Sequence, residues 1–376
     1  MIAIQDRFPH FKRPVTFLKY YLSKQYVKLY PQDMFVAVCG SLGKTTTVRL
    51  SQAVLSQKYK TITTEANKDS VTNIPQTLLK LNPSFQKAVL EMGADSAGEA
   101  DFYHSLVKPK VVILTRIISE QAEISKLLSF LPNDGIVILN WDDINSKKLA
   151  QQVPSQVVYY GTDPQNCTVW AANVRIENFR TNFELNLGVE RVKVELPALG
   201  LHQIYPALAA AGLGVIHGIP LTKIKIALES VEPEDHKFQL LLGPNGSYIL
   251  DDTFSATPIE VESAIDTLVQ IPARRRMLVL GEMIDPNYSA DEYRKIAEKI
   301  YKEKLDFIFL GQGSIKVIAE ELTSLGFWEE RVESNMLNSQ LVSKLLKILG
   351  KGDVCLIKCS RSVRLDEVVK RIARKN

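Results

Sequence analysis

The residues best suited to chemistry in this sequence form a short glycine loop followed by a lysine and threonines. The loop reads Gly-Ser-Leu-Gly-Lys-Thr-Thr-Thr over residues 40–47. Glycines let backbone N–H groups approach a polyphosphate, because no Cβ stands in the way. The lysine reaches the β- and γ-phosphates, and a threonine hydroxyl can bind Mg²⁺. An ordinary glycine turn before a helix is the alternative. We predict a nucleotide-binding loop made by Gly40, Ser41, Gly43, Lys44, Thr45 and Thr46.

A carboxylate at the end of a nearby strand extends this prediction. Glu91 directly follows an apolar run that ends at Leu90. Magnesium prefers oxygen ligands, and nucleotide sites commonly hold it with such a carboxylate in addition to the loop hydroxyl. We predict that Thr45 and Glu91 bind Mg²⁺. The alternative is that Glu91 is only a solvated residue at a strand end.

Alternating apolar runs and helical stretches predict the elements that position these residues. A strand over 34–39 precedes the loop, and a helix that continues through Leu55 follows it. Buried strands are also expected over 87–90, 111–114 and 136–139, separated by stretches that suit parallel crossovers. The pattern therefore predicts an α/β fold with a mostly parallel, doubly wound sheet around the P-loop.

The rest of the chain divides into an addition to this domain and a second domain. Three β-rich segments suggest a small antiparallel addition: 156–160, 168–176 and 191–196. Helices over 205–217 and 221–228 follow, and Pro233 marks a boundary. Strands and helices then alternate again, which predicts a Rossmann-like α/β domain. The predicted organisation is an N-terminal arm over 1–33, a central domain over 34–233 and a C-terminal domain over 234–376.

Composition limits the class of protein. The 376 residues carry 46 Lys+Arg against 42 Asp+Glu, and this net charge of +4 gives no reason to expect a nucleic-acid partner. Four cysteines without a CxxC pair fit a reducing compartment. The sequence has neither an apolar run of about 20 residues nor the pattern of a signal peptide. We therefore expect a cytoplasmic protein.

The segment 8–30 is basic and amphipathic. Apolar residues recur there at helical spacing, at Phe11, Val15, Leu18, Leu22, Tyr26 and Leu29, among several lysines. A helix packed against its own domain explains this pattern. Peripheral contact with an anionic membrane or with another protein explains it as well.

Several motifs in a fixed order resemble the Mur ligase family, and most closely the branch that adds D-alanyl-D-alanine to UDP-N-acetylmuramoyl tripeptide. They lie at residues 38–46, 64–75, 90–99, 134–143, 200–210, 250–258, 279–283 and 358–361. The resemblance implies an ATPase domain and a C-terminal domain that close on ATP with Mg²⁺. It also implies a muramyl-peptide carboxylate that attacks the γ-phosphate, and a D-alanyl-D-alanine-like amine that displaces phosphate from the acyl phosphate.

The resemblance assigns roles to individual residues. Lys44, Glu91, His202 and Lys237 would be catalytic, with Lys237 meeting the γ-phosphate. Asp252 would face the ribose. Gln203 stands where the family has the asparagine of its Gly-x-His-Asn motif, and is also expected at the nucleotide.

The sequence departs from the family at four places. Residues 1–33 are too few for the usual N-terminal domain, Ser255 replaces an Asn or His, and Lys237 replaces an Arg. Most important, the segment 115–124 is short, contains no metal-binding His, and places Gln121 or Ile124 where the family has a carbamylated Lys.

These departures leave the function open. Glu120, Glu123 and Lys126 could partly substitute for the missing metal ligands, or they form a polar helix face. The chain is then a divergent amide-forming ligase in peptidoglycan precursor synthesis, or a catalytically weakened Mur-like protein that binds nucleotide and regulates or scaffolds cell-wall synthesis. A ligase that adds glutamate to a folate-like substrate fits the motifs less well.

Overall fold

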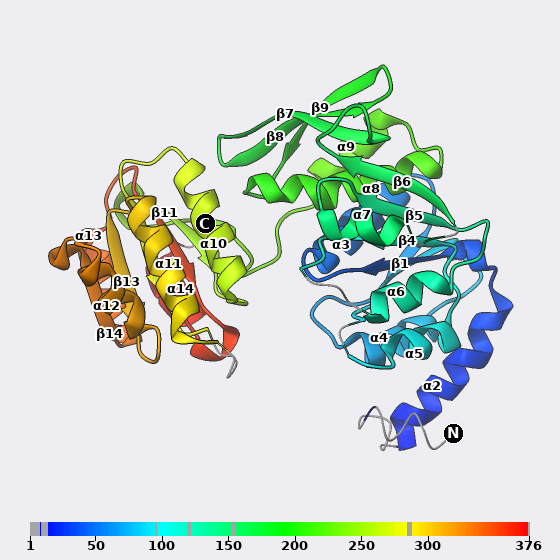
Figure 1. Ribbon diagram of the computed structural model, residues 1–376, viewed down its shortest axis with the longest axis horizontal. Coiled ribbons are helices and arrows are strands. Elements are labelled where there is room, and N and C mark those ends of the chain that lie inside the picture. Colours follow the sequence, from blue (N-terminus) through cyan, green and yellow to red (C-terminus); the bar gives the residue numbers. More distant parts are fainter. Residues whose placement is uncertain are drawn as a thin grey trace. The chain divides into compact units, whose positions relative to one another are not determined.

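The computed structural model describes residues 8, 14–94, 96–118, 122–151, 153, 155–283 and 288–374. The chain forms two compact units (Figure 1). Unit 1 comprises Met1–Arg175, Asn182–Leu196 and His202–Val231, and unit 2 comprises Ile176–Thr181, Pro197–Leu201 and Glu232–Asn376. Two short segments of the chain, Ile176–Thr181 and Pro197–Leu201, therefore belong to unit 2, although the main part of that unit begins only at Glu232.

A nine-stranded sheet organises unit 1, in the order β2-β3-β1-β4-β5-β6-β7-β8-β9. The strands are β1 (Phe35–Cys39), β2 (Thr61–Thr63), β3 (Lys87–Glu91), β4 (Val111–Leu114), β5 (Ile136–Asn140), β6 (Gln156–Gly161), β7 (Val169–Glu177), β8 (Arg180–Leu187) and β9 (Glu190–Leu196). The pairs from β2 through β7 are parallel, which confirms the predicted mostly parallel sheet. Two-residue turns connect β7 to β8 and β8 to β9, so that these strands form hairpins.

The prediction for the segment 156–160 was wrong in one respect. We expected it to begin a separate antiparallel addition, but β6 pairs in parallel with β5, with Val158 opposite Ile138. The addition begins only at β7 and continues the same sheet. The β-rich composition of this segment did not reveal its pairing, because composition favours a strand without fixing the direction of the neighbouring strand.

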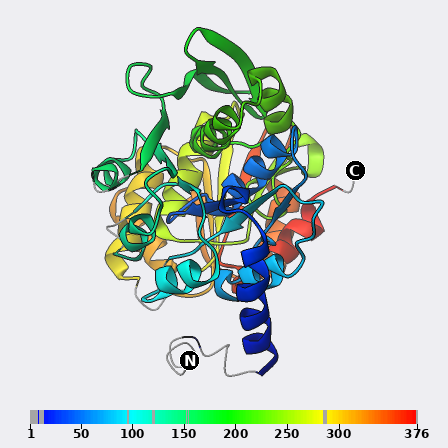
Figure 2. The same ribbon diagram turned by 90° about the vertical axis from the view of Figure 1, so that its right-hand side faces the viewer.

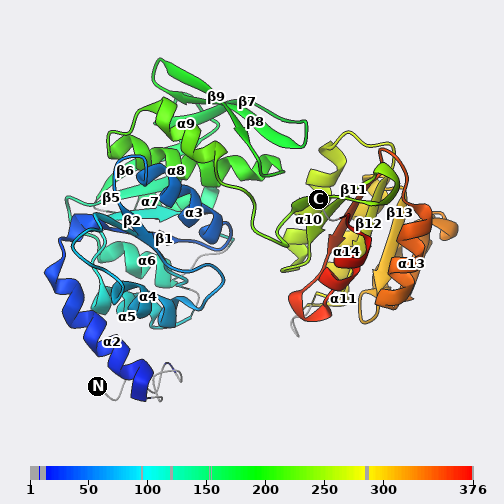
Figure 3. The same cartoon turned by 180° about the vertical axis from the view of Figure 1, so that it is seen from behind.

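Helices cover both faces of the sheet of unit 1 (Figures 1 and 3). They are α2 (Pro14–Tyr26), α3 (Lys44–Leu55), α4 (Ser70–Leu78), α5 (Glu99–Leu106), α6 (Ala122–Ser129), α7 (Ile144–Ala150), α8 (Ile204–Ile216) and α9 (Leu221–Glu229). Side chains of β1 alternate between two cores: Phe35, Ala37 and Cys39 enter one, and Val36 and Val38 the other. Burial on both faces explains why β1 is a continuous apolar run.

A six-stranded sheet organises unit 2, in the order β10-β11-β15-β12-β13-β14. Its strands are β10 (Gln239–Leu242), β11 (Tyr248–Asp252), β12 (Arg276–Leu280), β13 (Phe307–Gly311), β14 (Val332–Met336) and β15 (Val354–Lys358), and its helices are α10 (Pro258–Gln270), α11 (Ala290–Lys302), α12 (Lys316–Ser324), α13 (Asn338–Ile348) and α14 (Asp366–Ile372). All pairs are parallel except β10 with β11. Cores lie on both faces, as expected for the second α/β domain.

Within the described ranges, no helix has the length and apolar character needed to cross a membrane. All four cysteines are buried, and none of them forms a disulfide bond.

Candidate active site

The glycine loop leaves the carboxyl end of β1 through a sharp backbone turn at Gly40. Its φ is +131°, a conformation that L side chains rarely adopt. A Cβ at this position would lie 2.2 Å from Thr115 Oγ1. Residue 40 must therefore be glycine for the loop to pass this close to the end of β4.

The segment after β4 holds the loop in place. The N–H groups of Ser41 and Leu42 both donate to the carbonyl of Arg116, at 2.8 and 3.2 Å. The N–H of Ile118 donates to Ser41 Oγ at 3.1 Å. These two N–H groups of the loop are thus hydrogen-bonded to the segment after β4. Helix α3 begins at Lys44, directly after the loop. The N-terminus of a helix is suited to binding an anion, because its first N–H groups point away from the helix.

Lys44 lies over the loop. Its Nζ donates to the carbonyls of Gly40 and Ser41, at 2.6 and 3.4 Å. The ammonium group therefore lies against the backbone of the loop, where we expect it to contact the phosphates of a nucleotide.

The structure brings Thr45 and Glu91 together. The Thr45 hydroxyl donates to Glu91 Oε2 at 2.9 Å. The sheet register causes this contact, because parallel pairing of β1 with β3 places Val38 opposite Glu91 at the strand ends. Two oxygens that share an octahedral Mg²⁺ with bonds of 2.0–2.1 Å are about 2.9 Å apart, so this pair fits Mg²⁺.

The described residues contain no group of three or more His, Cys, Asp or Glu side chains that could hold a metal. Mg²⁺ in a nucleotide site is commonly held by one or two protein oxygens together with phosphate oxygens and water.

The loop 64–75 lies beside Glu91. The Glu91 N–H donates to Thr64 Oγ1 at 2.9 Å. The buried Asn73 clamps the loop, because its Nδ2 donates to the Glu65 carbonyl at 2.7 Å and its Oδ1 accepts from the Glu65 N–H at 3.3 Å. Hydrogen bonds from Lys68 and Lys80 lower the pKa of Glu65 to about 2.

Sequence reasoning gave no role to Asp143 and Asn145, which fix the segment after β4. The Ile117 N–H donates to Asp143 Oδ2 at 2.8 Å, and Asn145 Nδ2 donates to the Ile117 carbonyl at 2.9 Å. The motif 134–143 was a signal that this turn matters. The role of this turn depends on contacts between residues more than 25 positions apart in the sequence, which motif spacing alone does not reveal.

His202 and Gln203 lie just before α8. The side-chain nitrogens His202 Nε2 and Gln203 Nε2 are 3.1 Å apart, and His202 is exposed. The first turn of α8 lies beside the loop, because a Cβ at Gly43 would be 3.6 Å from Pro206 Cγ. Both residues thus lie a few positions from a helix turn that contacts the loop.

Asp252 lies in unit 2, at the end of β11, and is engaged by a buried lysine. Lys358 Nζ donates to Asp252 Oδ2 at 2.6 Å and to the Ser255 carbonyl at 2.7 Å. The Phe238 N–H donates to Asp252 Oδ1 at 3.2 Å. Burial raises the pKa of Asp252, and the charge of Lys358 opposes this shift. A ribose would share Asp252 with these partners.

Two family models match consecutive parts of the chain. The Mur ligase middle domain matches residues 38–214, and the Mur ligase, glutamate ligase domain matches residues 236–361. The chain belongs to the Mur ligase family. The P-loop, the Thr45–Glu91 pair and most of α8 lie within the first match, and Lys237, Asp252 and Lys358 lie within the second.

Two relatives of this Mur ligase carry the same name. The UDP-N-acetylmuramoyl-tripeptide–D-alanyl-D-alanine ligase of Escherichia coli (strain K12) is 29% identical over 350 residues, which cover 89% of this chain and 75% of that protein. The ligase of the same name from Bacillus subtilis (strain 168) is 28% identical over 364 residues, covering 92% of this chain and 78% of that protein.

Solved structures share the fold. MurF from Acinetobacter baumannii has a TM-score of 0.83 at 21% identity, covering 94% of this chain and 80% of that chain. MurF ligase from Thermotoga maritima in complex with ADP has a TM-score of 0.79 at 19% identity, covering 95% and 83%. The predicted fold class is confirmed.

The segment that departs from the family in sequence uses its candidate side chains for packing contacts. Lys126 Nζ pairs with Asp101 Oδ2 at 2.7 Å, and Glu123 Oε2 accepts from the Ala100 N–H at 2.8 Å. Ile124 is fully buried in the core. These contacts join α6 to α5. Glu120 and Gln121 lie outside the described residues.

In unit 2, Lys237 and Arg361 both lie near the ring of Phe254, an arrangement that the sequence did not indicate. Lys237 Nζ pairs with Glu234 Oε2 at 2.8 Å and lies 4.7 Å from the centre of the Phe254 ring. The Arg361 guanidinium lies 5.5 Å from the centre of the same ring. An arginine therefore contacts the same aromatic ring as the lysine that replaces the family arginine. Ser255 Oγ donates to Glu260 Oε1 at 3.2 Å, within the capping region of α10.

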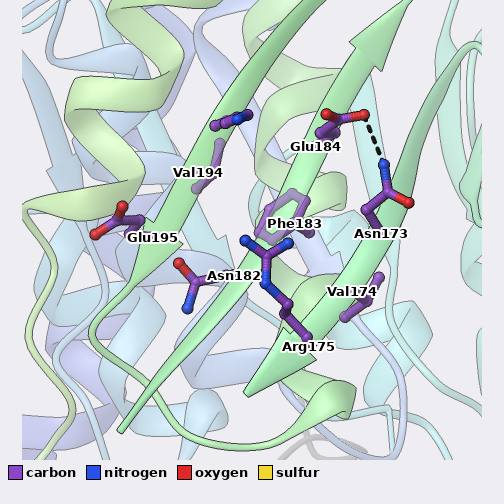
Figure 4. A pocket seen from close by; sticks show the side chains of 9 residues that line it. Asn173, Val174, Arg175, Asn182, Phe183, Glu184, Val194 and Glu195 are labelled. Carbon is purple, nitrogen blue, oxygen red and sulfur yellow. Dashed lines mark hydrogen bonds between the residues drawn. The ribbon is translucent and has the colours of Figure 1, made fainter. Parts of the chain in front are cut away.

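A hollow of about 360 Å³ lies elsewhere in unit 1, on β7, β8 and β9 (Figure 4). Its polar lining carries both signs of charge: Asn173, Arg175, Asn182, Glu184, Lys193 and Glu195. Asn173 Nδ2 donates to Glu184 Oε2 at 2.9 Å. None of the predicted site residues lines it.

Proposed function

We propose that this Mur ligase is an ATP-dependent carboxylate–amine ligase of peptidoglycan precursor synthesis. Its substrates are a muramyl-peptide carboxylate and a D-alanyl-D-alanine-like amine, as the names of its relatives suggest. The observation that carries the proposal is the arrangement of Lys44, Thr45 and Glu91 at the ends of β1 and β3. It combines one cation, one hydroxyl and one carboxylate with the N-terminus of helix α3.

The reaction proceeds in two steps. A carboxylate oxygen of the muramyl peptide attacks the γ-phosphorus, the bond from phosphorus to the β,γ-bridging oxygen breaks, and ADP leaves. The amine then attacks the acyl carbon, inorganic phosphate leaves, and the nitrogen loses a proton. Lys44 and the N-terminus of α3 bind and orient the phosphates in the first step. In that step negative charge redistributes over the γ-phosphoryl group and the departing ADP.

Thr45 and Glu91 would hold Mg²⁺, which when bound neutralises phosphate charge. The chain's own contribution is to fix the two oxygens 2.9 Å apart through the register of β1 and β3. The Thr64 hydroxyl further restrains the Glu91 backbone.

A second candidate is a weakened Mur-like protein that binds nucleotide and acts as a regulator or scaffold. The contacts of Lys126 and Glu123 favour it, because they leave these side chains engaged in helix packing and not in a second metal site. Both candidates bind ATP. Only the ligase couples ATP cleavage to two substrates.

The test is ADP release from the full chain with ATP, Mg²⁺, UDP-N-acetylmuramoyl tripeptide and D-alanyl-D-alanine. The proposal expects release that requires both substrates and is lost in Glu91→Gln. Release that is equal with and without the substrates, or no release despite measured ATP binding, would favour the second candidate.

A further inference from the structure

Helix α2 is held against unit 1 by one face. On that face Tyr20 and Ser23 are buried. The Tyr20 ring stacks on Phe102 with centres 5.4 Å apart, and its hydroxyl lies 2.9 Å from Ser105 Oγ. The Tyr26 hydroxyl donates to the Leu81 carbonyl at 2.8 Å. Aromatic residues with polar ends therefore dock this helix, which runs beside α4 and α5 (Figure 1).

The apolar stripe of the segment points the other way. Val15 is 65% exposed, Leu18 55%, Leu22 47% and Leu29 76%. Their spacing of three, four and seven residues places them on one side of the helix and its short 3₁₀ continuation. Single exposed apolar residues are normal on a protein surface, but four in one stripe are not scattered. The helix packs on its own domain, as one of the two interpretations expected, but of the predicted stripe Tyr26 takes part in that packing, whereas Val15, Leu18, Leu22 and Leu29 are exposed.

Basic residues accompany the stripe. Lys19, Lys24 and Lys28 lie along the same segment, and residues 14–32 contain no Asp or Glu. Lys19 and Lys28 are exposed. Apolar residues bordered by lysines, in a segment without carboxylates, match the interface of an anionic bilayer. The apolar side chains can enter the acyl-chain region, and the lysines can pair with the anionic headgroups. A second copy of the chain would bring like charges together, which disfavours self-association through this face.

The dimensions also suit a helix that lies on a bilayer. The 13 residues of α2 are about 20 Å long at 1.5 Å per residue, less than the hydrocarbon thickness of a membrane. Docking through Tyr20 and Ser23 leaves the stripe available without unfolding the helix. Figure 2 shows α2, in dark blue, extending from the body of unit 1.

We propose that the outward face of α2, formed by Val15, Leu18, Leu22 and Leu29 with Lys19 and Lys28, binds the surface of an anionic lipid bilayer. Binding is peripheral and reversible, since the stripe is short and no covalent anchor is required. The surface is separate from the nucleotide loop, so that membrane binding and ligase activity can be tested independently.

The experiment is co-sedimentation of the full chain with vesicles of phosphatidylcholine alone or mixed with phosphatidylglycerol. The test variant is Leu18→Glu/Leu22→Glu. The matched control is Ile226→Glu/Leu346→Glu, which adds the same charge at exposed apolar positions on α9 and α13. Thermal unfolding and ATP affinity check that every variant is folded. We expect wild type and control to bind anionic vesicles, the test variant to bind at least tenfold more weakly, and salt of about 1 M to release wild type.

Several results would overturn the inference. Wild type could remain in the supernatant, or bind neutral vesicles as tightly as anionic ones. The test variant could bind as tightly as wild type. If light scattering shows a wild-type dimer that the test variant converts to a monomer, the face is a protein interface and the assignment to lipid is wrong.

Discussion

At the scale of single residues, Lys44 has the clearest consequence for binding. Its ammonium group now donates to two loop carbonyls, and phosphate oxygens would replace or share these acceptors. We expect Lys44→Ala to weaken MgATP binding at least tenfold, or about 1.4 kcal/mol, because a charged hydrogen bond to phosphate is lost. Calorimetry measures this. The control is Lys223→Ala at an exposed position on α9, and equal affinities in the two variants would remove Lys44 from the site.

Lys126 is the residue that could take over the carbamylated lysine of the family. In the structure its side chain is 43% exposed and paired with Asp101. We therefore expect bicarbonate, which promotes lysine carbamylation, to leave the ligase rate unchanged, and Lys126→Ala to keep at least half of that rate. The rate is measured as ADP release. If bicarbonate raises the rate and Lys126→Ala abolishes the rise, Lys126 has the family role and the salt bridge is not its function.

At the scale of elements, apolar patterning predicted the buried strands and several helices. The strand over 111–114 has the predicted bounds, and the helices predicted over 205–217 and 221–228 agree with α8 and α9 to within one residue at each end. Burial on both faces gives β4 an unbroken apolar run, and Ser289 with Glu292 caps α11. In the site, the same logic placed Glu91 at the end of a strand, and the register then brought it to Thr45.

Patterning was less informative at edges and for packing partners. β10 and β14 are edge strands. β10 has only four residues and none of them is buried, and only Met336 of β14 is buried. For α2, periodicity found the stripe but not the direction in which it points. The docking face uses Tyr20 and Tyr26, whose hydroxyls find partners on other elements. Such contacts depend on tertiary structure and are invisible to hydrophobic periodicity.

The approach of the glycine loop to β4 makes a prediction at this scale. Gly40→Ala adds a Cβ that meets Thr115 Oγ1, and it also strains a positive φ, so that we expect ATP affinity to fall at least tenfold and the thermal midpoint of unfolding to decrease. Gly188→Ala is the control, because its φ of +56° is also positive but no atom lies within 4 Å of the added Cβ. Calorimetry of ATP binding compares the two. Unchanged affinity in Gly40→Ala would show that the loop can move away from β4 without loss.

At the scale of the whole molecule, the residues predicted to act in ligation are divided between the two matched domains. Lys44, Thr45 and Glu91 belong to unit 1, and Lys237 and Asp252 belong to unit 2. The two family matches follow each other in the chain, and the relatives named as ligases align across both. We propose that unit 1 binds the phosphates of ATP through Lys44, Thr45 and Glu91.

The central claim is that a substrate carboxylate, and not water, receives the γ-phosphoryl group. The direct measurement is a turnover with UDP-N-acetylmuramoyl tripeptide labelled with ¹⁸O in its reacting carboxylate, followed by mass spectrometry of the phosphate released. An acyl phosphate transfers one carboxylate oxygen to phosphorus, so the account predicts one ¹⁸O in each phosphate formed together with amide. Phosphate without ¹⁸O, whose new oxygen comes from water, would contradict it.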